Sequence, residues 1–175
     1  LSDNTTGNNN TAIGTNADVS TGNLTNATAI GYAAKVNASN KVRIGNASVT
    51  VIEGQVAFTA SSDRTKKENF QPVDGGEVLR KLRGIDVTSW NYIGHDPKAF
   101  RHYGPMAQDF HAAFGHDEVG AFGTDTTINV GDVAGVLMIA LKGLDGQVQK
   151  DRLTIEAQAK HVAQLEQERL VQAAE

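Results

Sequence analysis

The sequence predicts a mixed fold, in which a β-solenoid segment precedes an α+β domain with a long carboxy-terminal helix. Short copies of one Gly- and Asn-rich pattern recur before residue 50, and nearly all of the Phe, Tyr and Trp residues follow them. Near the end of the chain, apolar residues recur every seven positions. We therefore expect a fibre-like segment over residues 1–61 and a second domain over residues 62–175, with a helical tail at about 133–172.

The first segment contains an internal repeat. Thr11–Val19 matches Thr28–Val36, and Val42–Val49 is a looser third copy, so the spacings are 17 and then 14 residues. Each copy has an apolar residue, a Gly, a turn and a second short strand, which is too little to bury a face unless copies stack. Asn and Gly at the corners allow the left-handed backbone conformations of tight coils. The alternative is a disordered Asn/Gly-rich linker.

This repeat resembles the head repeats of trimeric bacterial adhesins, which form a left-handed β-roll shared among three chains. Three copies are few for a solenoid of one chain, so we expect neighbouring chains to cover the exposed edges and to form a homotrimer. Residues 50–58 then alternate apolar and polar side chains, which predicts a strand that packs one face.

Helical and strand patterns alternate in the second domain. Residues 73–82 predict a helix with Asp74 as its cap and Glu77 in a capping box. Residues 85–92 and 100–103 read as strands because of their β-branched and aromatic content. A short helix from Pro105 places Met106, Phe110 and Phe114 on one face.

The end of the chain is expected to form one long helix. Residues 116–127 are a Gly-rich loop, residues 128–130 read as a brief strand, and Asp132 is the expected helix cap. The seven-residue row consists of Leu141, Val148, Ile155 and Val162, with Leu144 and Leu165 in a companion row that Asp151 and Gln158 interrupt. Such a flawed row suits packing against a partner chain better than an independent rod.

Ser62 and Lys67 are the candidate catalytic pair. A serine hydroxyl needs a base to become a nucleophile, and an amine that has been taken out of water is the simplest base. A five-residue separation lets a turn bring the two side chains together. Ser61 and Lys66 have the same spacing, so the register is open, and the alternative interpretation is a polar linker with ordinary surface charges.

Three blocks resemble the endosialidase-type intramolecular chaperone family, in the order in which the family has them. They are Ser-Asp-x-x-x-Lys-Glu-Asn from Ser62, Leu79-x-x-Leu82-x-Gly84-Ile85-x-Val87-x-x-Trp90-Asn91-Tyr92, and His102-Tyr103-Gly104-Pro105-Met106-Ala107-Gln108-Asp109-Phe110. The resemblance implies a carboxy-terminal domain of phage tail spikes and tail fibres. Such a domain helps the upstream fibre of its own chain to form a trimer and then releases itself by autoproteolysis with a Ser/Lys dyad. The location implied is the virion, after assembly in the cytoplasm of the bacterial host.

In this scheme the dyad is Ser62 and Lys67. Attack on the carbonyl of Ser61 closes a five-membered ring, so the expected scissile bond is Ser61–Ser62, whereas attack by another chain could cut Ser62–Asp63 instead. His102 lies beside the third block and is an accessory candidate that could orient the peptide or donate to an oxyanion. The alternative for His102 is a structural histidine.

Other functional classes find little support in the composition. A net charge of −4 with mixed signs argues against nucleic acid, and no apolar run is long enough for membrane insertion. The histidines lack zinc-like spacing and no phosphate-binding loop is present, so we expect no metal and no cofactor. The start at Leu1 indicates a fragment of a longer chain.

The rival functions are an inert trimeric adhesin or clamp, and a receptor-binding tip that uses residues 116–127. Trp90, Tyr92, Phe110 and Phe114 are either core residues or a surface for a folding client.

Overall fold

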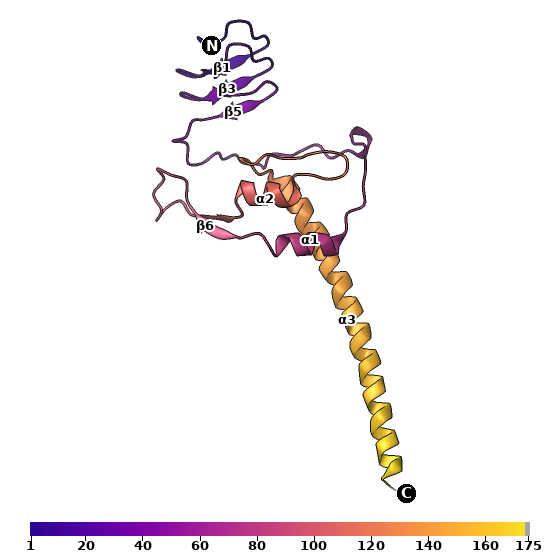
Figure 1. The fold of residues 1–175 in the computed structure, drawn as a ribbon. Helices are drawn as coiled ribbons and strands as arrows, with labels where there is room; N and C mark the ends of the chain where they lie inside the picture. The colour runs from indigo at the N-terminus through magenta and orange to yellow at the C-terminus, as the bar shows by residue number, and fades with distance from the viewer. Residues whose placement is uncertain (174–175) are drawn as a thin grey trace. The chain divides into compact units, whose positions relative to one another are not determined.

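The structure is a computed structural model that describes residues 1–173. Its elements are β1 (Thr11–Ile13), β2 (Asp18–Val19), β3 (Thr28–Ile30), β4 (Lys35–Val36), β5 (Val42–Ile44), the 3-10 turn η1 (Arg64–Lys66), α1 (Gly75–Leu82), β6 (Thr88–Trp90), β7 (His102–Gly104), α2 (Ala107–Phe114) and α3 (Val130–Gln172) (Figure 1). Contacts divide the chain into two units. The first is Leu1–Ala60 with Trp90–His102, and the second is Ser61–Ser89 with the described residues from Tyr103 onward.

The repeat copies lie on one another in register. β1, β3 and β5 form a three-stranded parallel sheet in that order, in which Thr11 pairs with Thr28 and Thr28 pairs with Val42. β2 and β4 form a second parallel pair, in which Asp18 lies opposite Lys35. Figure 1 shows the three longer strands as successive rungs. The register therefore follows the same 17- and 14-residue spacings as the sequence copies.

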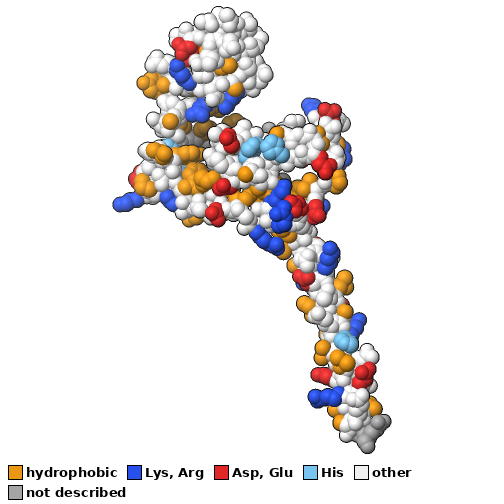
Figure 2. Space-filling model, in the orientation of Figure 1, with side chains coloured by type: hydrophobic (Ala, Val, Ile, Leu, Met, Phe, Trp, Pro, Cys, Tyr) orange, Lys and Arg blue, Asp and Glu red, His pale blue; other side chains and the backbone are white. Residues whose placement is uncertain are grey.

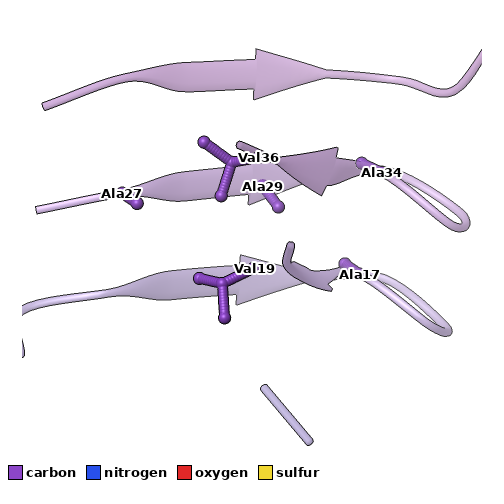
Figure 3. Close-up of a cluster of buried hydrophobic side chains, with 6 residues drawn as sticks. All are labelled: Ala17, Val19, Ala27, Ala29, Ala34 and Val36. Atoms are coloured by element: carbon purple, nitrogen blue, oxygen red, sulfur yellow. The ribbon is translucent and has the colours of Figure 1, made fainter. Parts of the chain in front are cut away.

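A small apolar core lies between these rungs. It consists of Ala17, Val19, Ala27, Ala29, Ala34 and Val36, and Figure 3 shows their side chains among the strands. Four of the six are alanines, so the rungs approach closely. On the outer face, Ile13, Ile30 and Ile44 pair along the sheet and are exposed in the single chain.

The corners of the repeat use left-handed backbone conformations at matching positions. Asn9, Asn26 and Asn40 all have φ between 55° and 58°, and they follow the 17- and 14-residue spacings. Gly14 has a φ of +118°, and a Cβ at that position would lie 2.8 Å from the carbonyl carbon of Gly31. A side chain at Gly14 would thus prevent the two copies from stacking.

Asp18 is a buried carboxylate at the start of the repeat segment, with 4% of its surface exposed. Burial alone would raise its pKa, but hydrogen bonds from the Ser2 hydroxyl and from the amides of Asp3 and Val19 outweigh burial and lower the pKa to about 2. The charge is therefore held by donors rather than left unpaired.

The second unit is built around the crossing of α1 and α3. Its core consists of Val78, Phe110, Phe114, Val136 and Ala140, with contributions from α1, α2 and α3. The carboxylate of Asp74 accepts from the amides of Gly76 and Glu77, so the predicted cap of α1 is confirmed. A capping box also requires the Glu77 side chain to accept from the backbone N–H of Asp74. This part of the prediction is wrong, because the Glu77 carboxylate pairs with Arg80 instead.

Four other expectations for secondary structure are also wrong. Residues 128–130 do not form a strand, and α3 is capped by Asn129, whose side chain accepts from the Gly131 amide at 2.8 Å. Asp132 lies inside the first turn of α3, three residues too late to cap it.

Residues 50–58 form no strand and are exposed, because an alternating pattern needs a neighbouring strand to supply hydrogen bonds. Met106 precedes α2 and is 38% exposed, so the buried face of that helix is formed by Phe110 and Phe114.

The outer part of α3 extends beyond the packed core of this unit (Figure 1). Val148, Ile155 and Val162 are between 41% and 62% exposed. Figure 2 shows apolar side chains along this part of the helix among charged ones. Among residues 1–173, no helix is long and apolar enough to cross a bilayer.

Candidate active site

The structure brings the side chains of Ser62 and Lys67 together. The Lys67 Nζ donates a hydrogen bond to the Ser62 Oγ at 2.7 Å. This is the distance that a base needs to take the hydroxyl proton. No such bond joins Ser61 to Lys66 within the described part of the chain, so the geometry favours the Ser62/Lys67 register.

A short turn produces this arrangement. Asp63 has extended backbone angles (φ −64°, ψ 127°), and its carboxylate accepts from the backbone N–H and the hydroxyl of Thr65, both at 2.9 Å. The Lys66 amide donates to the Asp63 carbonyl at 3.1 Å, and the Lys67 amide donates to the Arg64 carbonyl at 3.2 Å. These bonds form η1 and return the chain so that Lys67 faces Ser62.

A second contact closes the other end of this loop. The Arg64 guanidinium lies over the Phe70 ring, 5.6 Å from its centroid, and Asn69 adopts a left-handed conformation with φ of +55°. An asparagine tolerates that conformation better than most residues with a side chain. These contacts all lie within residues 62–70.

The pair is exposed to water, as are all side chains from Ser61 to Phe70. Water stabilises the charged form of an amine, and only the neutral form is a base. The geometry for proton transfer is therefore present in the single chain, while the dry surroundings that activate such a base are not.

His102 lies in the other contact unit. Its ring stacks on Trp90, with centroids 4.7 Å apart, and it packs edge-to-face with Tyr92, with centroids 5.6 Å apart. The same group extends through His95, which contacts both Tyr92 and Phe100. His102 is thus held by aromatic packing, which is the structural role considered as its alternative.

The four aromatic residues considered as core or client surface divide between these roles. Phe110 and Phe114 pack against each other at 5.2 Å in the core of the second unit. Trp90 is half-buried, whereas Tyr92 is 58% exposed. The core interpretation holds for the phenylalanines, and the exposed face of Tyr92 is available for contacts.

The 116–127 loop is closed by local hydrogen bonds. His116 and Ala121 form an antiparallel bridge, and the Asp117 carboxylate accepts from the amides of Gly120 and Val119. These bonds, led by that from Gly120, lower the pKa of Asp117. Within residues 1–173, no group of three or more His, Asp or Glu side chains is placed to hold a metal ion.

One known protein family matches the segment that contains the Ser62/Lys67 pair. Residues 62–119 match the model of a peptidase family described as chaperone of endosialidase, and the match begins at Ser62. This segment is an endosialidase-type chaperone domain. Searches of curated proteins and of solved structures gave no match.

The match covers 58 of the 175 residues and assigns this segment a role at a coarse level. The family comprises intramolecular chaperones associated with trimeric phage tail spikes, and its peptidase description relates them to self-cleavage. The match includes α1, β6, β7 and α2, as well as the loop that carries Ser62 and Lys67.

Sequence reasoning missed Asp63 and Thr65 within the endosialidase chaperone segment. The signal was nevertheless present, because an Asp followed two residues later by a hydrogen-bonding Thr is the pattern of an Asx turn. The spacing of Ser62 and Lys67 showed that the two side chains could meet, but the turn that makes them meet depends on Asp63.

Proposed function

We propose that this chain is the end of a phage tail fibre or tail spike, with an intramolecular chaperone that forms a homotrimer, assists folding of the upstream fibre and then releases itself by autoproteolysis. The observation that carries the proposal is the 2.7 Å hydrogen bond from Lys67 to Ser62, at the first residue of the family match. The virion is the corresponding location of the product.

The proposed reaction is an acyl shift followed by hydrolysis. Lys67, as the neutral amine, takes the hydroxyl proton of Ser62, and the Ser62 Oγ attacks the carbonyl carbon of Ser61 through a five-membered ring. The Ser61–Ser62 peptide bond breaks, and the leaving Ser62 amine receives the proton back from Lys67. The resulting ester between Ser61 and the Ser62 side chain is hydrolysed by water, which leaves a Ser61 carboxylate and Ser62 as a new amino terminus.

Assembly is the step that activates the pair. In one chain the pair is open to water, and water stabilises the charged form of an amine, which is not a base. Neighbouring chains in a trimer would exclude water from the loop and favour the neutral amine. Cleavage then follows trimer formation and does not precede it.

This order of events has a clear benefit for folding. Pairing of β-strands between chains is slow and leaves apolar edges open to aggregation. A domain that associates first raises the local concentration of the other segments. Removal of that domain afterwards makes unfolding practically irreversible, and the fibre gains kinetic stability.

A denaturing gel tests the proposal. The parent protein should give two fragments, whereas Ser62→Ala and Lys67→Ala should each give one band at 18.6 kDa while the trimer still forms. Lys66→Ala is the matched control because it removes the neighbouring amine, and it should be cut normally. One intact band for the parent protein and for Ser62→Ala alike would support the inert trimeric clamp.

Sequencing of the released carboxy-terminal fragment identifies the bond. A fragment that starts at Ser62 agrees with attack within the chain. A start at Asp63 would reject that route and indicate cleavage after Ser62 by a group from another chain.

A further inference from the structure

Asp63 follows Ser62 directly and precedes Lys67 by four residues, but its carboxylate contacts Thr65. Both of its side-chain hydrogen bonds are accepted from Thr65, and its carbonyl accepts from the Lys66 amide. One residue therefore accepts three of the bonds that form the turn between Ser62 and Lys67. The carboxylate acts on the turn and is not engaged with the reacting atoms.

The turn is short enough for one residue to decide its conformation. η1 spans only Arg64–Lys66, and Lys67 follows it with extended backbone angles (φ −129°, ψ 149°). Free side chains in a flexible loop of this length would meet only part of the time. Fixing them at contact distance raises their effective concentration, which is a major source of rate acceleration.

We propose that Asp63 is a positioning residue for self-cleavage, which holds Lys67 against Ser62 by capping the turn between them. This inference rests on the proposed function. The bonds from the Thr65 amide and then from its hydroxyl lower the pKa of Asp63, in agreement with a carboxylate that serves as the acceptor.

Two substitutions at Asp63 separate positioning from acid–base chemistry. Asp63→Asn keeps an oxygen acceptor and is as good a helix cap as Asp, but it has no carboxylate. Asp63→Ala has neither. If Asp63 positions Lys67, Asp63→Asn should be cut at about the parental rate. Asp63→Ala should be cut about fivefold more slowly, which corresponds to the roughly 1 kcal/mol of turn stability that loss of a cap typically costs. A carboxylate that acted as an acid or base would be lost in both variants.

Asp74→Ala is the matched control. Asp74 has similar backbone angles to Asp63 (φ −74°, ψ 116°) and caps α1 in the same way, but it lies outside the 62–67 loop. Its loss should lower the stability of the second unit without slowing cleavage. Cleavage rates are measured from gel time courses of the full chain, with trimer content measured on the same samples.

The outcomes separate the positioning role of Asp63 from the proposed self-cleavage. Equal rates for Asp63→Ala and the parent protein, with Ser62→Ala uncut, would overturn the positioning role and leave the proposed function intact. Slow cutting of Asp63→Asn would also overturn it, and so would equal slowing by Asp74→Ala. Normal cutting of Ser62→Ala would remove the proposed function and this inference with it.

Discussion

Ala33 is the residue in the repeat segment whose side chain least suits its backbone. It has φ of +51°, whereas the equivalent residue of the preceding copy, 17 positions earlier, is Asn16 with φ of +59°. The conformation is fixed because the Ala33 amide donates to the Thr15 carbonyl at 2.9 Å. A left-handed conformation costs a residue with an ordinary side chain roughly 1–2 kcal/mol, and asparagine less.

We expect Ala33→Asn to stabilise the protein by up to about 1 kcal/mol, because asparagine adopts this conformation more readily. Urea denaturation followed by circular dichroism measures the effect. Ala33→Val is the opposing control, since a β-branched residue at positive φ is strongly disfavoured. A lower stability of the asparagine variant than of the parent protein would contradict this account.

Single residues also set the limit of what the sequence could predict. The prediction of the cap at Asp74 is correct because the apolar stripe of α1 starts at Val78, about one helical turn after the cap. The cap of α3 was placed at Asp132 although Asn129 serves, because both residue types cap helices and the apolar stripe begins only at Val133. The Ser62/Lys67 contact was expected from spacing and family resemblance, but the contribution of Asp63 required the backbone of the turn.

At the scale of elements, α1 and α3 cross at two glycines. A Cβ on Gly143 would lie 2.6 Å from the carbonyl carbon of Gly75, and a Cβ on Gly75 would lie 2.7 Å from the Cα of Gly143. The contact is between backbones, so no flexible side chain can move aside. Gly143 therefore weakens α3 locally but permits the packing that holds α1 on it.

We expect Gly143→Ala to destabilise the second unit by roughly 1–3 kcal/mol, the usual cost of overpacking. Gly146→Ala is the control on the same helix, because nothing lies within 4 Å of its added Cβ. That change should be neutral or stabilise the helix by up to about 1 kcal/mol. Thermal unfolding of both variants checks the pair, and similar shifts in the same direction would show that the crossing is not the cause.

Elements with a clear period were predictable, and those that depend on a partner were not. α1 and α3 follow apolar stripes, and the 17- and 14-residue spacings match the strand register. Residues 50–58 alternate just as clearly but form no strand in the single chain. Alternation specifies which face of a strand is apolar, while the hydrogen bonds must come from a neighbour.

At the scale of the whole molecule, the outer part of α3 carries apolar residues that no element of residues 1–173 covers. Ile155 and Val162 belong to the seven-residue row and are 62% and 53% exposed. A helix of this kind gains its stability from packing against other helices. In the proposed trimer this row lies between the three chains.

We expect the double variant Ile155→Asp/Val162→Asp to reduce trimer formation strongly, since unpaired charges buried in a seam cost several kcal/mol each. Leu153→Asp/Leu170→Asp is the control, because these leucines are also exposed but fall outside the row. Light scattering at micromolar concentration measures the association state. Equal trimer content in the two double variants would show that the row has no special role.

The last rung of the repeat has a further consequence for solubility. β5 ends its sheet, so its outer backbone edge is an open template on which a strand from any other molecule could add. The exposed residues Lys41 and Arg43 belong to this last rung, and the Arg43 Nε donates to the Gly45 carbonyl at 3.0 Å, which holds the guanidinium beside the strand. Two such edges that approached each other would bring like charges together within the screening distance of about 8 Å at physiological salt. Repulsion between these positive charges therefore opposes edge-to-edge pairing of β5 strands from different molecules during assembly.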